Sequence, residues 1–355
     1  MDRRTFIKSA GVASAITGLG LTGINLQGKI QQVAHSNNKK LKILFLGGTN
    51  YIGPVIINEL LQHGHSVTLF NRGSTQQELF PSLEKVIDNR IPTIDKGLSA
   101  LNNNKKWDVI IDTWQGSPLG VRDSCELLKD RCNQYIYIST IAVYGRINFT
   151  TVEGLTENHS IPQQTLPDTY DVKQSYGTRK RSSEQVAKSI LGNKLTILRP
   201  HSICGYSLDK ESDNQRYWPI RLQRGGEIVA PGDGLDTTQY TDVIDLSRFV
   251  AHTINNSLYG TFNTFATDNM YAFLYGLKAI SSLSSQLHFL DYQFLKRQNI
   301  SSFTDMPMWV PRQRIPGFFS ISNQKAIDHG YRIRPLAESF KTVVEGFNPL
   351  ECVST

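Results

Sequence analysis

The distribution of apolar and polar residues between positions 42 and 73 predicts a strand, a tight turn, a helix and a second strand. Residues 43–46 are all apolar and residues 67–70 nearly so, which is typical of strands buried on both faces of a sheet. Between them, apolar residues recur at the spacing of one helix face, at Ile52, Val55, Ile56, Leu60 and Leu61. Pro54 falls in the first helical turn, where its missing N–H costs little, and Gly64 ends the helix.

The same alternation continues as far as residue 200. We expect strands at 85–88, 107–112, 135–138 and 195–198, and helices at 95–104, 121–132 and 176–191. Strands alternating with helices predict an α/β fold with a doubly wound parallel sheet, the Rossmann arrangement, whose ligands bind at the carboxyl ends of the strands. Gly and aromatic residues become frequent after residue 200, so residues 201–348 are predicted to form a smaller substrate-binding region over the Rossmann domain at 41–200.

The turn after the first strand has the composition of a dinucleotide-binding turn. The N-terminus of a helix carries unpaired N–H groups and a partial positive charge, which together attract a pyrophosphate. Gly47 allows the turn to be tight, and Gly53 lets the helix pack close to the strand. The predicted cofactor contacts in this stretch are Gly47, Gly48, Thr49, Asn50, Tyr51, Ile52 and Gly53.

This turn resembles that of the extended short-chain dehydrogenase/reductase family, and in particular its NAD-dependent epimerase/dehydratase branch. The family has Gly-x-x-Gly-x-x-Gly here, whereas Asn50 replaces the middle glycine in this chain. An atypical subgroup of the family, with Gly-Gly-Thr-Arg-Phe-Ile-Gly, is the most similar. Blocks that match this subgroup continue to residues 329–336, so the resemblance covers about 41 to 348. It implies a bound NAD or NADP.

Ser139 and Thr140 end the fifth predicted strand and are followed by Val-Tyr-Gly at 143–145. This block also resembles the family, whose catalytic hydroxyl then corresponds to Thr140. Ser139 is its neighbour and a candidate substrate contact. Two hydroxyls that merely cap a strand end are the alternative.

A Tyr-x-x-x-Lys motif supplies the other candidate catalytic groups, Tyr176 and Lys180. The spacing also occurs at 206–210 and 292–296, but only Tyr176 opens a helix after the Ser-Thr strand and before the next core strand. Residues four apart share one helix face, so Lys180 can stand beside Tyr176. The resemblance implies that Lys180 also holds the nicotinamide ribose. We expect Lys180 and the nicotinamide charge to lower the phenol pKa from about 10, so that Tyr176 can accept a substrate proton.

Residues after other strand ends complete the predicted cofactor site. The second strand ends in Asn71 and Arg72, where an acidic residue usually selects NAD. An Arg here favours NADP over NAD, because it can pair with the 2′-phosphate; a surface Arg is the alternative. Asp88 and Thr113 follow the third and fourth strands. Tyr217 and Trp218 either line a substrate pocket or belong to the core.

Charge and cysteine content narrow the class of function. The formal net charge is +7, but most of the excess lies within residues 1–40, and the rest of the chain has about +2. Bulk charge therefore does not indicate a nucleic-acid surface. The four cysteines and the histidines show no metal-ligand spacing, which argues against a metal hydrolase, and we expect the cysteines to be free thiols or core residues.

The first 36 residues are predicted to be a targeting segment and linker outside the fold. Arg3-Arg4 precedes Thr5-Phe6-Ile7-Lys8 and a moderately apolar, Gly-rich stretch. This resembles a twin-arginine export signal, which implies the twin-arginine translocation machinery as a partner and a destination in the periplasm or at the outer face of the cytoplasmic membrane. A disordered basic tail or an amphipathic leader is the alternative. No later apolar run is long enough to span a membrane.

Together, these features predict an NAD(P)-dependent epimerase- or dehydratase-like enzyme with a tightly bound cofactor. The resemblance implies a sugar or sugar nucleotide as its small-molecule substrate. Two alternatives stay open: a reductase with exchangeable cofactor, and a non-catalytic nucleotide- or RNA-binding protein of the same fold. The second arises because plant chloroplast stem-loop RNA-binding proteins are similar to the atypical subgroup.

Overall fold

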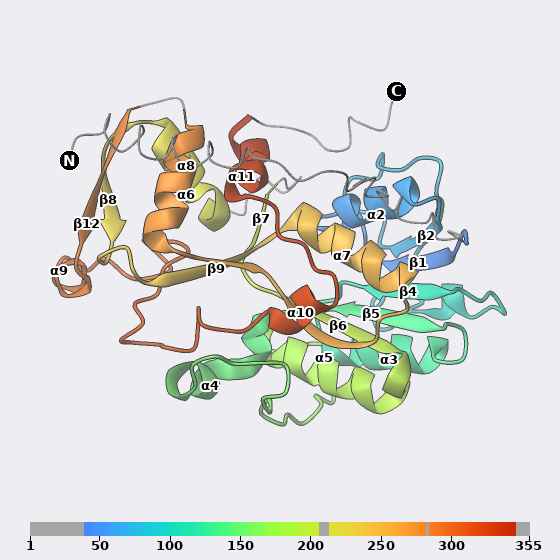
Figure 1. Ribbon diagram of the computed structural model, residues 1–355. Helices are drawn as coiled ribbons and strands as arrows, with labels where there is room; N and C mark the ends of the chain where they lie inside the picture. Colours follow the sequence, from blue (N-terminus) through green and yellow to red (C-terminus); the bar gives the residue numbers. More distant parts are fainter. Residues whose placement is uncertain (1–38, 206–212, 282–283, 346–355) are drawn as a thin grey trace, which may run out of the picture. The chain divides into compact units, whose positions relative to one another are not determined.

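The computed structural model of the chain describes residues 39–205, 213–281 and 284–345, so the predicted signal and linker lie outside the described residues. Its centre is a seven-stranded sheet in the order β10-β6-β5-β4-β1-β2-β3, in which every neighbouring pair is parallel (Figure 1). The strands are β1 (Lys42–Leu46), β2 (Ser66–Asn71), β3 (Glu84–Ile87), β4 (Val109–Asp112), β5 (Gln134–Ile138), β6 (Leu195–Pro200) and β10 (Gly260–Thr264). The predicted doubly wound parallel sheet is confirmed.

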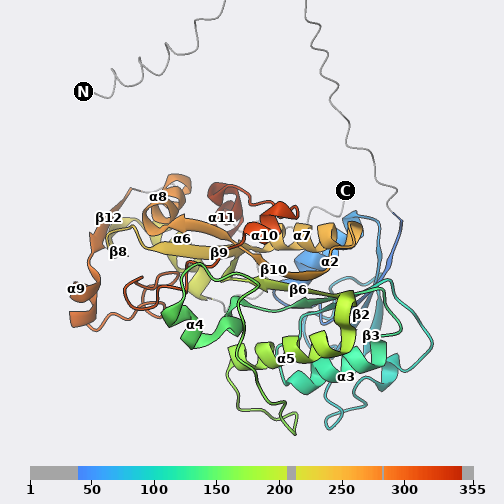
Figure 2. The ribbon, with the colours of Figure 1, turned by 60° about the horizontal axis from the view of Figure 1, so that its bottom comes forward.

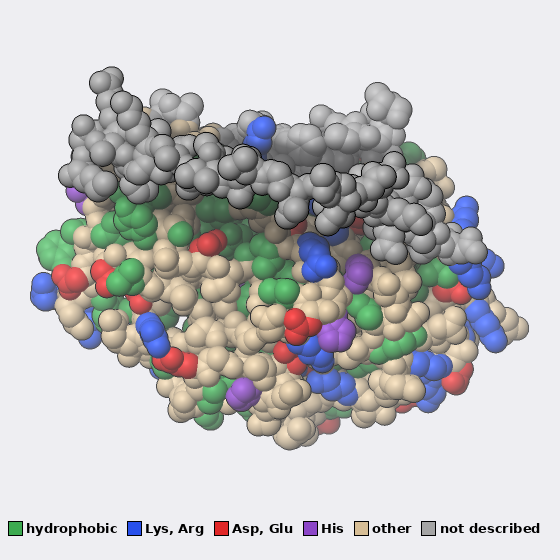
Figure 3. Space-filling model, viewed as in Figure 1, with side chains coloured by type: hydrophobic (Ala, Val, Ile, Leu, Met, Phe, Trp, Pro, Cys, Tyr) green, Lys and Arg blue, Asp and Glu red, His purple; other side chains and the backbone are tan. Residues whose placement is uncertain are grey.

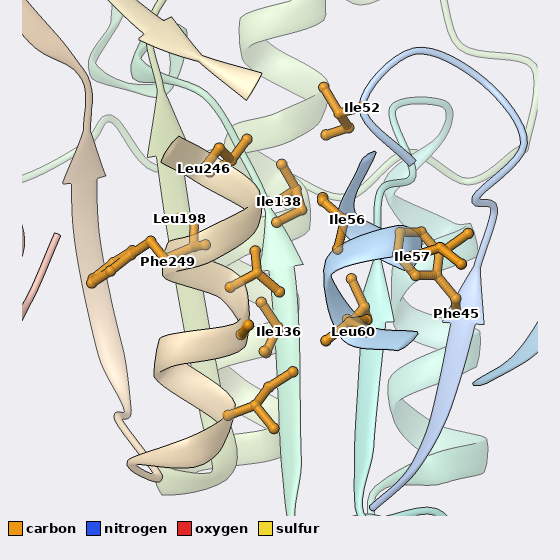
Figure 4. Close-up of a cluster of buried hydrophobic side chains, with 14 of the residues drawn as sticks. Phe45, Ile52, Ile56, Ile57, Leu60, Ile136, Ile138, Leu198, Leu246 and Phe249 are labelled. Carbon is orange, nitrogen blue, oxygen red and sulfur yellow. The ribbon is translucent and has the colours of Figure 1, made fainter. Parts of the chain in front are cut away.

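Helices cover both faces of this sheet because successive strand residues point to opposite faces. Ile43 and Phe45 face α2 (Gly53–Gln62) and α7 (Val243–Asn255), which lie side by side in Figure 4. Leu44 and Leu46 face the other way, toward α3 (Pro118–Leu128) and α5 (Tyr176–Leu191), the two helices that come forward in Figure 2. Burial on both faces accounts for the runs of consecutive apolar residues in the sequence.

Most of the predicted elements occur, but one helix does not. α5 begins and ends at the predicted residues, with the Ser175 hydroxyl accepting from the Thr178 N–H at its N-terminus. The helix expected at 95–104 is wrong: the structure has a single 3-10 turn there, η1 (Ser99–Leu101). Gly97 is left-handed, with a φ of 64°, and three asparagines follow the turn, so neither end can extend it.

The region predicted at 201–348 contributes both to the main sheet and to a second apolar core. Its α7 and β10 complete the main sheet, so the division expected at residue 200 does not separate the sheet from the rest. Two smaller sheets and several helices surround a separate apolar core. These elements are β7 (Ile203–Cys204), β8 (Gly226–Pro231), β9 (Thr237–Asp242), β11 (Ala266–Asn269), β12 (Ser285–Leu290), α6 (Asp213–Gln223), α8 (Met270–Ile280), α9 (Tyr292–Arg297) and α11 (Leu336–Glu345), whereas α10 (Gln324–Asp328) packs against β10 of the main sheet. No helix among the described residues is long and apolar enough to cross a membrane.

His201, directly after β6, is enclosed by aromatic rings and is only 2% exposed. Its ring centroid lies 5.1 Å from that of Phe318 and 4.8 Å from that of Phe319, and its Nε2 is 3.1 Å from the Phe318 carbonyl oxygen. Burial lowers the pKa of His201 to about 4, although the carbonyl contact acts in the opposite direction. The imidazole is therefore neutral in the folded protein over most of the acidic range.

This burial predicts a loss of stability in mild acid. The unfolded chain takes up the His201 proton near pH 6.5 and the folded chain near pH 4, so the contribution is complete above pH 6.5 and is lost as the pH falls through 4. The full contribution is about 3 kcal/mol. Urea unfolding of the wild type and His201→Gln between pH 7 and 4 checks this, with exposed His159→Gln as control. Equal pH slopes for His201→Gln and the wild type would contradict the prediction.

Candidate active site

A cavity of about 450 Å³ lies at the carboxyl ends of the central strands. Its walls come from the turn after β1, the segments that follow β2, β3, β4 and β5, and the start of α5. Almost all predicted site residues meet there: Gly47, Gly48, Thr49, Asn50, Tyr51, Ile52, Asn71, Arg72, Asp88, Thr113, Ser139, Tyr176 and Lys180. Sequence positions up to 133 residues apart thus converge at the sheet edge where this fold class binds ligands.

Glycine is required at two positions of the turn. Gly47 has a φ of 112°, and a Cβ there would lie 2.6 Å from the Thr113 Oγ1. A Cβ on Gly53 would lie 2.6 Å from the backbone of Gly48, so α2 packs directly against the turn. Asn50 meets no such limit, because it is exposed and its Oδ1 accepts from the Tyr51 N–H at 2.8 Å. The replacement of the middle glycine is therefore compatible with the turn.

The N-terminus of α2 has no side-chain cap, and the residues leading into it line the cavity. By contrast, Ser117, Ser175 and Asp242 cap α3, α5 and α7 with their own side chains. The Gly53 N–H donates to the Asn50 carbonyl at 3.0 Å and Pro54 has no N–H, so what this end of α2 offers a pyrophosphate is chiefly the positive end of the helix dipole. Together with the two glycines, this fits a dinucleotide.

The opposite end of the cavity carries the residues predicted to select the cofactor. The Asn71 Oδ1 accepts from the Gly73 N–H at 2.9 Å and shapes the loop after β2. Arg72 is exposed on that loop and makes no hydrogen bond or ion pair to the part of the chain that the structure describes. Asp88 is buried beside it, with its N–H donating to the Asn71 carbonyl at 3.0 Å. An anion at this end would therefore meet Arg72.

Tyr176 and Thr140 meet at the other end. Tyr176 is the first residue of α5 and is 41% exposed, and the Thr140 side chain interacts with its hydroxyl. Partial burial raises the pKa of Tyr176, and Thr140 and Arg179 lower it by less. The expected lowering of this pKa below 10 by Lys180 is therefore wrong for the protein alone, because the Lys180 ammonium is directed elsewhere.

Lys180 is 2% exposed and lies one helical turn beyond Tyr176. Its Nζ donates to the Ile138 carbonyl at 2.6 Å and to the Trp114 carbonyl at 2.7 Å. Burial lowers the pKa of Lys180 to about 7, a shift that Asp112 and Glu184 oppose. The amine thus changes charge near neutral pH at the wall of the cavity.

The three candidate substrate residues lie in three different environments. Ser139 lines the cavity, but its side chain is 2% exposed and interacts with Glu184 behind the strand. Trp218 is 1% exposed in the apolar core, with its indole N–H donating to the Pro307 carbonyl at 2.6 Å. Of the two alternatives for Trp218, the structure therefore shows the core one, and its expected substrate contact is wrong. Tyr217 is at the surface and stacks edge-on against it; it does not line the cavity.

Arg90 and Trp114 also line the cavity and were not predicted. Arg90 is 5% exposed and forms a bidentate ion pair with Asp112. Both residues follow soon after the carboxyl end of a strand, as Asp88 and Thr113 do. That position in the sequence could have identified them as candidate site residues. The partnership itself could not be seen, because Arg90 and Asp112 are 22 residues apart.

A sequence model of the NAD dependent epimerase/dehydratase family matches residues 43–263, more than half of the chain. The chain belongs to this family. The family is named for its dependence on NAD, and the lining of the cavity fits a dinucleotide of that kind. Lys180, the turn and the α2 N-terminus are the groups available to hold that cofactor.

Two plant proteins are similar in sequence. The 41 kDa chloroplast stem-loop binding protein b of Arabidopsis thaliana is 25% identical over 234 residues, which is 62% of this chain and 57% of that protein. Phenylcoumaran benzylic ether reductase 1 of the same plant is 33% identical over 116 residues, 30% of this chain and 33% of that one. The match thus spans 57% of the length of the first relative and 33% of the length of the second.

Solved structures agree in fold. A putative epimerase from Burkholderia cenocepacia has a TM-score of 0.64 at 16% identity, covering 86% of this chain and 97% of that one. A dTDP-4-dehydrorhamnose reductase from Bacillus anthracis, solved with NADP, has 0.57 at 17%, covering 87% and 100%. A UDP-glucuronic acid 4-epimerase from Bacillus cereus, solved with NAD, has 0.55 at 17%, covering 86% and 99%. At these identities the likeness shows the family's fold.

Proposed function

We propose that the protein catalyses a redox-neutral epimerisation or elimination on a sugar nucleotide, with a tightly held NAD(P). The observation that carries this is the contact between the Tyr176 hydroxyl and Thr140 beside the cavity that Tyr176 and Lys180 line. Support for the substrate class comes from the structural neighbours, which include proteins solved with UDP-glucuronic acid and UDP-glucose. A bound NAD(P) supplies reversible hydride transfer at a substrate carbon.

The protein's own groups would handle the proton. Tyr176 accepts it from the substrate hydroxyl, and Thr140 donates a hydrogen bond to the same oxygen. Because burial raises the Tyr176 pKa, the phenol needs a nearby positive charge to act as a base. Arg179 already lowers this pKa, and the positive nicotinamide of a bound oxidised cofactor would lower it further.

Export fits the redox-neutral chemistry. Arg3-Arg4 and the residues after them resemble a twin-arginine signal, and such signals serve proteins that fold before they are exported. A nucleotide bound in the cytoplasm stabilises the folded chain by mass action. The space outside the cytoplasmic membrane is not expected to resupply NAD(P), so an enzyme there benefits from ending each cycle with the cofactor it began with.

Replacing Tyr176 by Phe tests the base. Loss of the hydroxyl removes the proton acceptor while leaving the walls of the cavity, so we expect turnover to fall by about 100-fold or more and NAD(P) affinity to stay nearly unchanged. Steady-state rates on UDP- and dTDP-sugars, with nucleotide titrations, measure both. Tyr292→Phe is the matched control, because it belongs to a second Tyr-x-x-x-Lys motif far from the cavity. Wild-type rates in Tyr176→Phe would rule out this role.

Arg72→Ala tests the cofactor preference. We propose that NADP is favoured, because Arg72 stands unpaired by described residues where the 2′-phosphate would lie. A charge-assisted bond of this kind contributes about 1.5–3 kcal/mol, so NADP affinity should fall at least about tenfold and NAD affinity little. Fluorescence titration with NADPH and NADH measures both, with exposed Arg146→Ala as control. Equal losses for the two nucleotides would refute the preference.

The purified exported protein provides the main test of the proposal. We expect near-stoichiometric NAD(P) to remain after extensive dialysis, as measured by mass spectrometry of the nucleotide released on denaturation. Protein that emerges empty, exchanges nucleotide within seconds and reduces a substrate with added NADPH would instead be an ordinary reductase.

The stem-loop binding relative makes RNA the other outcome to examine. On the face shown in Figure 3, outside the grey atoms, basic and acidic side chains are interspersed, which does not favour a phosphate-binding surface there. Filter binding of a structured RNA at physiological salt tests this directly. Submicromolar binding by a chain without turnover would overturn the enzymatic proposal.

A further inference from the structure

The Lys180 ammonium is held by two backbone carbonyls of unequal rigidity. The Ile138 carbonyl ends β5, whose neighbours on both sides are strands of the sheet. The Trp114 carbonyl belongs to the loop after β4, beyond the last paired residue, and also accepts from the Tyr137 hydroxyl at 3.0 Å. The position of Lys180 therefore depends on what holds this loop.

The loop is fixed at both the backbone and the side chain of Trp114. Its N–H donates to the Asp112 Oδ1 at 2.9 Å, and its indole N–H donates to the Ser117 carbonyl at 2.8 Å. A Cβ at Gly116 or Gly120 would lie 2.6 Å or 2.9 Å from the indole, so both glycines leave space for the ring. The position of the Trp114 carbonyl therefore depends on the position of the Asp112 side chain.

Asp112 is fixed in turn by a buried ion pair. Its side chain is 0% exposed and accepts from Arg90 at 2.7 Å and 2.5 Å and from the Tyr135 hydroxyl at 2.6 Å. Arg90 is also held by the Gly120 carbonyl at 2.8 Å and by Ser124, and its guanidinium lies 5.1 Å from the Trp114 ring centroid. A desolvated pair of this kind usually costs more than it returns in stability, which favours a role beyond stability.

We propose that Arg90 and Asp112 are positioning residues for Lys180. They hold the Trp114 carbonyl where, with the Ile138 carbonyl, it keeps the Lys180 Nζ at the wall of the dinucleotide cavity. This inference rests on the role proposed for Lys180 above. It extends the active site by a chain of contacts from the segment after β3 to α5, of which Arg90, Trp114 and Lys180 also line the cavity.

The chain of contacts also has an electrostatic consequence. Around Lys180, Asp112 and Glu184 raise its pKa and Arg90 and Arg179 lower it, while burial brings the value to about 7. The Tyr137 ring, 4.6 Å from the Nζ, adds a favourable contact for the ammonium. Removing the Asp112 charge or the fixed carbonyl disfavours the ammonium, so both changes lower the Lys180 pKa further.

Asp112→Asn and Arg90→Lys test this in the whole protein. Lysine labelled with ¹³C at Cε is titrated by NMR, and the Lys180 signal, assigned with Lys180→Arg, stands apart because exposed lysines titrate above pH 10. We expect the Lys180 midpoint to fall by about half a unit to one unit in Asp112→Asn, and in the same direction but less in Arg90→Lys, which keeps the charge. NADPH affinity should fall in both.

Arg334→Lys is the matched control, because Arg334 forms a largely buried ion pair with Asp242 and Asp245, none of which touches the Trp114 loop or acts on the Lys180 pKa. A merely structural role predicts lower melting temperatures in all three variants with an unchanged Lys180 midpoint, and that result would overturn the proposal. So would an equal shift in Arg334→Lys. Since the titration needs no substrate, a shifted midpoint in a protein without sugar-nucleotide turnover would refute the proposed function and leave the positioning role standing.

Discussion

The structure depends on the close approach of α2 to the turn after β1. Gly53 lies against the Gly48 backbone without room for a methyl group, and this contact sets the height at which the helix starts above the sheet. The apolar face of α2 then reaches the same core as α7, and the uncapped N-terminus opens toward the strand ends. One steric constraint thus serves both the packing of the sheet and the shape of the cofactor site.

The local parts of this arrangement could be predicted from the sequence, and the long-range parts could not. Ser175 precedes α5 and Gly192 follows it, so the residues next to the helix determine where it begins and ends. β10 has the sequence GTFNT, with one large apolar residue, and it is a strand because it pairs with β6. In the sequence, an apolar residue such as Trp218 suits a substrate pocket and a core equally well. Only its packing in the structure shows that it belongs to the core.

The candidate site shows the same division. The carboxyl ends of parallel strands indicated where Asp88, Thr113 and Ser139 would meet, because that edge is a property of the fold. The spacing of Tyr176 and Lys180 indicated a shared helix face but not the direction of the amine, which two backbone carbonyls determine. Charges in this site are thus set by groups that lie close in space and far apart in the chain.

The completion of the main sheet by β10 and α7 bears on how the protein is made. During synthesis, β6 emerges with one edge unpaired, and it stays so until β10, which ends at Thr264, has left the ribosome. An exposed edge of a parallel sheet is a site for aggregation, and pairing over such distances is slow. The growing chain must therefore be protected while the 64 residues between Pro200 and Thr264 are added, under a fifth of its 355 residues.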